Sequence, residues 1–132
     1  MLKLFFKKEK WEDSCQELLK NQISEHDFVI KHADRKVFYS TPFGEDKNGK
    51  PQLWILSGTG SNIGYYPVFS SSKRCNSFFN SIGRADFLII EGDINSALEG
   101  LDSHEILTQF GLIIDPDSNS PIAISPGIRV KK

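Results

Sequence analysis

Two stretches of the chain repeat their apolar residues at the spacing of an α-helix. Residues 11–23 carry one stripe, formed by Trp11, Cys15, Leu18, Leu19 and Gln22. Residues 70–83 carry a second stripe, formed by Cys75, Phe78, Phe79 and Ile82. Serines precede the second stripe and Gly83 follows it, as is typical of a helix N-cap and a helix end. The pattern therefore predicts two amphipathic helices.

Runs of strand-forming residues alternate with polar turns in the rest of the chain. The predicted strands are residues 27–33, 36–43, 52–58, 64–70, 86–92, 112–115 and 121–125. An Asn48-Gly49 pair in the polar loop 44–51 marks a turn. The run 86–92, DFLIIEG, is almost continuously apolar, which predicts a strand covered on both faces or at the centre of a sheet. The last two strands flank the polar turn 116–120 and should pair with each other.

Two shorter helices are predicted between residues 93 and 111. Asp93 is placed to cap the first, and Ser103 is placed to cap a turn that Gly111 ends. Helices and strands mix without strict βαβ repetition, which favours an α+β fold with a mainly antiparallel or mixed β-sheet and helices packed on it. No linker or internal repeat interrupts the chain, so residues 1–132 should form a single domain.

Composition and charge exclude several classes of protein. The 132 residues are 39% hydrophobic and 25% charged, with a net charge of −1, which gives no overall attraction to nucleic acid or to anionic lipid. No run approaches the roughly 20 apolar residues of a membrane span, and the start lacks a signal cleavage site. Cys15 and Cys75 form no CxxC motif. We therefore expect a reduced, cytoplasmic chain without a membrane partner.

A glycine-rich stretch, SGTGSNIG at residues 57–64, raises the possibility of a phosphate-binding loop. Its spacing is G-x-G-x-x-x-G, and a strand-like segment with Pro67 follows instead of a helix. A dinucleotide or Walker loop needs a helix N-terminus at that place, and a Walker loop also needs a lysine. The stretch is better interpreted as a glycine hairpin that joins two strands.

Other chemical motifs are incomplete. Asp115, Asp117 and Asn119 have the spacing of calcium ligands, but Ser120 and Pro126 stand where such a loop needs glycine and glutamate. The three histidines lack zinc-site spacing, and no nucleophile-histidine set is visible. The sequence therefore predicts no catalytic residues, no metal and no cofactor.

Acidic residues are concentrated in one part of the chain. Between Ala85 and Ser120 there is no lysine or arginine, while the first ten and the last four residues are rich in them. The acidic residues are Asp86, Glu91, Asp93, Glu99, Asp102, Glu105, Asp115 and Asp117. They are either solvated caps and turns or an acidic face that docks a basic partner, where complementary charge gives specificity and raises the association rate.

Three segments resemble the N-terminal domain of the SseB family (enhanced serine sensitivity protein B). They are YYPVFSSSKRCNSFF, ADFLIIEGDINSALEGL and FGLIIDPDSNSPIAISPGIRV, and together they cover about residues 53–130. The chain departs from the family at Asp115, where asparagine is usual, and at Gly127, where an acidic residue is common; it also lacks the family's C-terminal domain. The resemblance implies an α+β fold and a binding module, and it supplies no catalytic residues.

The sequence leaves two functions open. One is a protein-binding module that acts as a bacterial immunity protein, whose acidic residues would bind and neutralise a basic, nuclease-type toxin such as an effector of contact-dependent inhibition. The alternative is an SseB-like housekeeping or regulatory adaptor linked to amino-acid metabolism. An enzyme with an unrecognised site or a nucleic-acid binder is less consistent with the motifs and the charge. We expect a monomer or a weak homodimer, because an exposed strand edge can pair with another copy.

Overall fold

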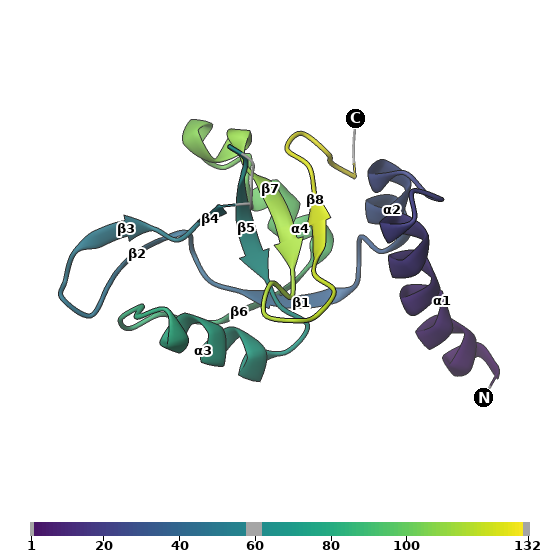
Figure 1. The fold of residues 1–132 in the computed structure, drawn as a ribbon, viewed down its shortest axis with the longest axis horizontal. Coiled ribbons are helices and arrows are strands. Elements are labelled where there is room, and N and C mark those ends of the chain that lie inside the picture. Colours follow the sequence, from purple (N-terminus) through teal and green to yellow (C-terminus); the bar gives the residue numbers. More distant parts are fainter. Residues whose placement is uncertain (1, 58–61, 131–132) are drawn as a thin grey trace.

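The computed structural model describes residues 2–57 and 62–130, and it shows an α+β fold (Figure 1). The helices are α1 (Leu2–Leu19), α2 (Glu25–Lys31), α3 (Ser72–Ser81), α4 (Ile94–Gly100) and the 3₁₀-helix η1 (Glu105–Gln109). The strands are β1 (Lys36–Tyr39), β2 (Phe43–Glu45), β3 (Pro51–Leu53), β4 (Leu56–Ser57), β5 (Gly64–Val68), β6 (Ile90–Asp93), β7 (Gly111–Ile114) and β8 (Ile122–Ile124). The coarse fold class predicted from the sequence is confirmed.

Four strands form the central sheet in the order β4-β5-β7-β8. β5 and β7 are parallel, and the other two pairs are antiparallel, so the sheet is mixed. The predicted pairing of the last two strands is confirmed, with Leu112 opposite Ile124. The predicted glycine hairpin is confirmed only in its flanks, where Leu56 pairs with Tyr65, because residues 58–61 lie outside the described residues.

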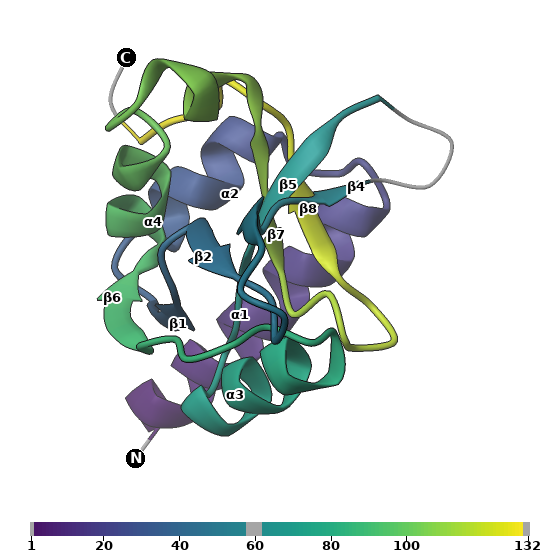
Figure 2. The ribbon, with the colours of Figure 1, turned by 90° about the vertical axis from the view of Figure 1, so that its left-hand side faces the viewer.

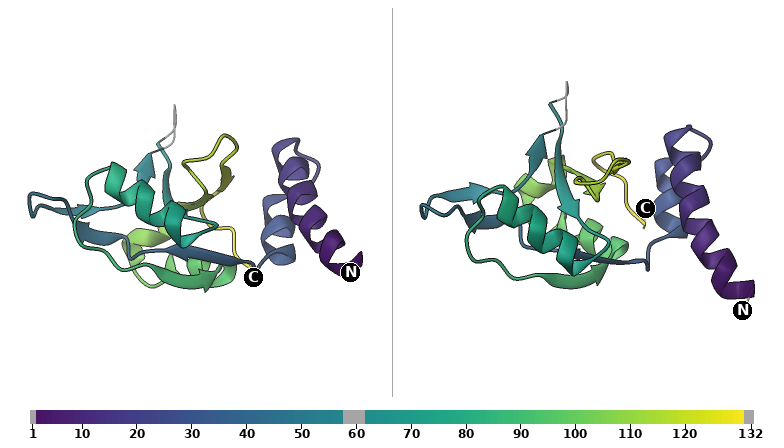
Figure 3. Two further views of the ribbon diagram at one scale, coloured as in Figure 1. Left: turned by 90° about the horizontal axis from the view of Figure 1, so that it is seen from below. Right: turned by 60° about the horizontal axis from the view of Figure 1, so that its bottom comes forward.

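Two smaller, two-stranded sheets accompany this sheet. β1 pairs with β6, and reciprocal backbone hydrogen bonds of 2.7 and 2.8 Å between Phe38 and Phe69 join β1 to the chain just after β5. β2 and β3 form a hairpin that projects at the end of the molecule opposite α1 and α2 (Figure 1 and Figure 3). Figure 2 shows β6 leading directly into α4 along one side of the fold. This side carries the groove described below.

Apolar side chains gather in two clusters. The larger cluster lies between the central sheet and helices α2 and α4, and it contains Phe28, Leu98 and Leu112 among its fully buried members. The smaller cluster lies under α3 and includes Phe69 and Phe79. Trp11 of α1 packs against the larger cluster. The guanidinium carbon of Arg35 lies over the Trp11 ring, 3.8 Å from the ring centroid.

Residues 27–33 were predicted to form a strand, and this prediction is wrong. The segment belongs to α2, whose N-cap Ser24 accepts a 3.0 Å hydrogen bond from the backbone N–H of Asp27. Glu25 and Asp27 occupy the first turn, where carboxylates are stabilised by the helix dipole. Phe28 and Val29 are both fully buried in the larger cluster, against which α2 packs.

The prediction of a centrally buried strand at residues 86–92 is also wrong. The strand is only β6, and in the described part of the chain it pairs with β1 alone. Phe87 and Ile89 pack against the smaller cluster, whereas Leu88 is 83% exposed and Ile90 is 43% exposed. An apolar run does not reveal whether one face or both faces are covered, and here half of it faces solvent.

The remaining differences concern where elements begin and end. α1 starts nine residues before the predicted helix and stops before Asn21, which has a φ of +60°. The predicted strand 52–58 is split into β3 and β4 around the buried Trp54. Ser103 does not cap η1; its hydroxyl donates to the carbonyl of Gly100 at 2.6 Å.

Three predicted helix ends are confirmed. Ser71 caps α3 by accepting a 3.1 Å hydrogen bond from the N–H of Arg74, and Gly83 follows that helix with a φ of +82°. Asp93 caps α4 in a reciprocal capping box with Ser96, whose hydroxyl accepts from the N–H of Asp93 at 3.0 Å. These caps fix where α3 and α4 begin.

Candidate binding groove and acidic face

A groove of about 270 Å³ lies between the chain that follows β1 and the segment from α4 to η1. Tyr39 of β1, Tyr66 of β5, Leu101 after α4 and Leu107 of η1 line it and are buried, so they form its base. Ile90 of β6 also lines it and is partly exposed at the rim. We call this feature the Tyr39 groove.

The hydroxyl groups around the Tyr39 groove already have partners. The Tyr39 hydroxyl lies 2.8 Å from the Ser96 hydroxyl, and the Tyr66 hydroxyl donates to the backbone carbonyl of Ser40 at 2.6 Å. Burial raises the pKa of Tyr66 above its usual value of 10.0, so this phenol remains a hydrogen-bond donor into alkaline pH. The base of the groove therefore offers mainly ring and aliphatic surface to a ligand.

An aromatic contact stands beside the groove. The rings of Phe43 and His104 meet edge to face with centroids 5.2 Å apart, and these residues directly follow Pro42 and Ser103, which line the groove. Phe43 is 43% exposed and nearby Ile106 is 51% exposed. Phe43 and Ile106 are thus exposed apolar side chains that lie within one residue along the chain of groove-lining positions.

A buried arginine supports one wall of the groove from behind. Arg84 is only 2% exposed, and its Nη2 donates to the carbonyls of Thr41 and Phe43 at 2.8 and 3.3 Å. Its guanidinium faces the rings of Trp54, Phe79 and Phe87 at 4.7–5.6 Å. Burial lowers the pKa of Arg84. Cation–π contacts stabilise the charge, and the two hydrogen bonds hold residues 41–43 in place.

Five of the eight predicted acidic residues lie on the β6-to-η1 segment that borders the groove: Glu91, Asp93, Glu99, Asp102 and Glu105. Three of them have internal partners. Glu91 pairs with Lys36 at 3.4 Å, Asp93 caps α4, and Asp102 makes a bidentate pair with Arg129 at 2.9 and 3.0 Å. This pair lowers the pKa of Asp102.

Glu99 and Glu105 are exposed and form no ion pair with any side chain that the structure describes. Glu99 lies on α4 one residue before Gly100, and Glu105 begins η1 two residues before Leu107. Gly100 and Leu107 both line the Tyr39 groove. These two exposed carboxylates therefore follow or precede groove-lining residues closely along the chain and have no ion-pair partner among the described side chains.

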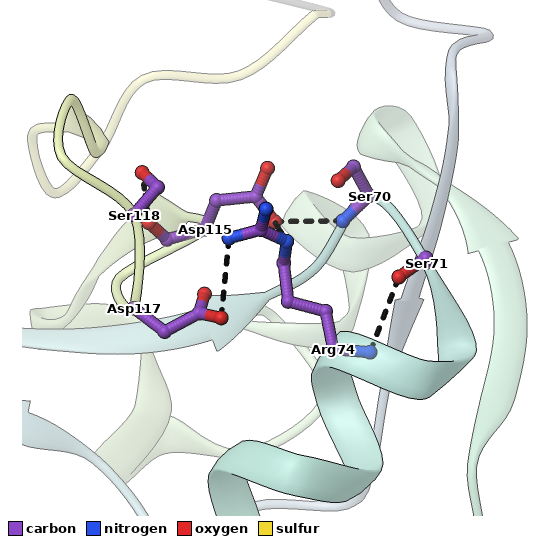
Figure 4. A network of polar contacts seen from close by, with 6 residues as sticks. All are labelled: Ser70, Ser71, Arg74, Asp115, Asp117 and Ser118. Atoms are coloured by element: carbon purple, nitrogen blue, oxygen red, sulfur yellow. Dashed lines mark hydrogen bonds and ion pairs between the residues drawn. The ribbon is translucent and has the colours of Figure 1, made fainter.

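Asp115 and Asp117 lie away from the groove, in the turn between β7 and β8 and beside the first turn of α3, as Figure 4 shows. Arg74 contacts both carboxylates, at 3.8 Å to Asp115 and 3.1 Å to Asp117. Asp115 also accepts a 2.8 Å hydrogen bond from the N–H of Ser70, and its φ of +52° places it in the turn after β7. These two residues connect the β7–β8 turn to α3. Asp86 is exposed in the loop after α3.

The described side chains contain no group of three or more His, Cys, Asp or Glu that could hold a metal ion. The two carboxylates of the calcium-like spacing contact Arg74 instead. Burial raises the pKa of both Cys15 and Cys75 to about 11, so both thiols are protonated and poorly nucleophilic at neutral pH.

The sequence did not reveal the Tyr39 groove. Its lining comes from β1, β5, β6, α4 and η1, and no local pattern indicates that these parts meet. No helix among residues 2–57 and 62–130 has the length and apolar character to cross a membrane. Comparison with protein-family models, with curated proteins and with solved structures gave no match.

Proposed function

We propose that this chain is a non-enzymatic protein-binding module that binds a basic partner protein through the Tyr39 groove and the adjoining carboxylates. The observation that carries the proposal is the juxtaposition of an apolar groove with Glu99 and Glu105, which have no ion-pair partner among the described side chains. Protein interfaces combine an apolar centre with a polar rim in this way. The SseB-like pattern in the sequence supports the same class of function.

In its specific form, the proposal is that the chain is a cytoplasmic immunity protein. A nuclease toxin needs a positively charged cleft to hold its nucleic acid. Glu99 and Glu105 would face lysines or arginines at the margin of that cleft, while the apolar groove supplies affinity. Asp86, Asp115 and Asp117 are not needed for this interface, because they lie on other elements. Glu91, Asp93 and Asp102 would contribute less, because each already has an internal partner.

The test begins with the gene beside the one for this chain: the proposal expects it to encode a large secreted protein with a toxin domain at its C-terminus, and that domain is then used. Co-expression should protect cells from that domain, and the two chains should co-purify. The double variant Glu99→Lys and Glu105→Lys should weaken the complex at least about tenfold, because attraction becomes repulsion. The matched control is Glu12→Lys with Asp13→Lys on α1, which makes the same change in net charge at two exposed positions.

Each outcome decides between named alternatives. Protection that the groove-side variant removes and the α1 variant preserves supports the immunity function. An equal loss with both variants would show only a dependence on net charge. If no complex and no protection occur with the unmodified chain, the immunity proposal fails. In that case, specific capture of enzymes of amino-acid metabolism, sensitive to the same double variant, would favour the regulatory adaptor.

A further inference from the structure

We infer that the Tyr39 groove receives one aromatic side chain of the partner, and that lysine or arginine residues beside this aromatic residue pair with Glu99 and Glu105. The inference rests on the proposed function and deepens it by naming the chemistry of the partner's contact segment. It is carried by the size of the groove, by the state of its polar groups and by the charge around it.

The size of the groove favours a side chain over a small-molecule cofactor. Its volume of about 270 Å³ is below the range of about 300–1,000 Å³ that is typical of small-molecule sites. A single aromatic ring fits such a volume, and the binding energy of protein interfaces is concentrated in aromatic and arginine side chains that fill pockets. The base, formed by Tyr39, Tyr66, Leu101 and Leu107, offers edges and faces of rings and aliphatic groups to such a ring.

The hydroxyl groups that line the groove are already hydrogen-bonded within the chain, which favours an apolar ligand. Tyr39 and Ser96 bond to each other, and the Ser103 hydroxyl donates to the carbonyl of Gly100. An apolar occupant therefore leaves these groups paired, whereas a strongly polar occupant would lose its hydration without gaining a free partner in the base.

Charge identifies what should flank the aromatic ring. Glu99 and Glu105 lie on the two elements, α4 and η1, that form one side of the groove. Their carboxylates are exposed, so they would keep water around them until a partner's ammonium or guanidinium groups approach. An acidic partner segment would be repelled by both. In a basic segment with a central aromatic residue, the aromatic ring would fill the apolar groove and the basic side chains would pair with Glu99 and Glu105.

The structure also provides a way to fill the groove. Gly100 lines the Tyr39 groove, its φ is not positive, and a Cβ placed on it meets no atom within 4 Å. A phenylalanine at this position therefore meets no backbone strain, and because Gly100 is a lining residue its ring is expected to compete with the ligand for the groove. Gly100→Ala is the matched control, because it adds only the Cβ.

The experiment is an NMR titration of the full chain with three blocked peptides: acetyl-Lys-Trp-Lys-amide, acetyl-Lys-Gly-Lys-amide and acetyl-Glu-Trp-Glu-amide. The first should shift the backbone amides of Thr41, Ser103 and Leu107 in a saturable way. The other two should bind at least tenfold more weakly. Gly100→Phe should abolish the shifts, and Gly100→Ala should preserve most of them. If Gly100→Phe does not fold, Ile90→Asn at the exposed rim, which removes apolar surface without changing the charge, should weaken binding of the first peptide instead.

Several results would overturn the inference. They are equal binding of the glycine peptide, shifts confined to other parts of the chain, and binding that the groove variants leave unchanged. Amide shifts that follow the protein concentration alone would show that a second copy of the chain occupies the groove, which also overturns it.

Failure of this inference can be distinguished from failure of the proposed function. A cognate complex that forms equally well with Gly100→Phe would retain the protein-binding function and reject the aromatic ligand. Specific binding of acetyl-Lys-Trp-Lys-amide without any protection from a toxin domain would retain the groove assignment and reject immunity.

Discussion

The guanidinium of Arg84 donates a 2.8 Å hydrogen bond to the backbone carbonyl of Thr41, and Thr41 lines the Tyr39 groove. The bond connects the end of α3 to a wall of the proposed binding site. Because Arg84 is enclosed by Trp54, Phe79 and Phe87, it has little freedom to move. The groove wall is therefore preformed, which reduces the entropy lost when a partner binds.

Replacing Arg84 tests this support. Arg84→Lys should lower the free energy of unfolding by about 1–3 kcal/mol, because a lysine lacks the planar guanidinium that faces the three rings and its more strongly hydrated ammonium costs more to bury. Chemical denaturation followed by circular dichroism measures the change. Arg74→Lys is the control on α3, where the arginine is partly exposed, and it should cost less than about 1 kcal/mol. Equal effects of the two substitutions would contradict a special role for Arg84.

Gly92 of β6 is expected to tolerate no side chain. A Cβ there would meet the Tyr39 hydroxyl and would lie 2.6 Å from the Ser96 hydroxyl, so Gly92→Ala should cost about 1–3 kcal/mol. Tyr39→Phe removes the oxygen that the Cβ meets, and adding it to Gly92→Ala should recover part of that loss. A double-mutant cycle of thermal unfolding measures the coupling. Strictly additive losses would show that the alanine does not act through Tyr39.

The Asp102–Arg129 ion pair predicts that the free energy of unfolding decreases at acid pH. Its arginine lowers the folded-state pKa of Asp102, so the pair stabilises the fold above the unfolded pKa of about 3.9, and this stabilisation is lost as the pH falls through the lower, folded value. Asp102 is 54% exposed, so Asp102→Asn should cost no more than about 1 kcal/mol at pH 7. The difference should shrink below about pH 4, as urea titrations at several pH values would show. In an Arg129→Gln background, where the pair is already absent, Asp102→Asn should have no such profile.

Both thiols should be slow to react in the folded protein. Their pKa of about 11 exceeds the ordinary value of 9.0, so at pH 8 the thiolate fraction is about 100-fold lower than in the unfolded chain. A disulfide reagent should label both cysteines at least that much more slowly in buffer than in denaturant. Because folding raises these pKa values, their contribution to stability is complete below pH 9 and falls as the pH rises toward 11. Cys15→Ala combined with Cys75→Ala should reduce this alkaline loss.

Local signals predicted local structure well. Ser71, Gly83 and Asp93 fix helix ends through contacts within a few residues, and these contacts can be recognised in the sequence. Residues 27–33 and 86–92 were misinterpreted because an apolar run does not specify its period or which of its faces is covered. The exposed Leu88 and Ile90 show how far tertiary contacts decide that question.

The candidate site was predictable only in part. The concentration of acidic residues was visible in the sequence. The sequence could not show that Arg74 forms ion pairs with Asp115 and Asp117, or that Arg129 forms one with Asp102. These pairs join residues that are 27 or more positions apart. The Tyr39 groove depends on the pairing of β1 with β6, which is equally remote along the chain.

The parallel pairing of β5 with β7 also has a consequence for the ribosome-bound chain. Tyr65 lies opposite Gly111, so β5 has no neighbour on that side until α3, β6, α4 and η1 have all been synthesised. Val68 has no strand partner until Ile114 has been synthesised, and β7 has no partner on its other side until β8 has been synthesised. A chain that ends before residue 124 leaves an unpaired apolar edge, which invites aggregation or proteolysis. Residues 111–124 therefore complete the central sheet and cover the edge of β5.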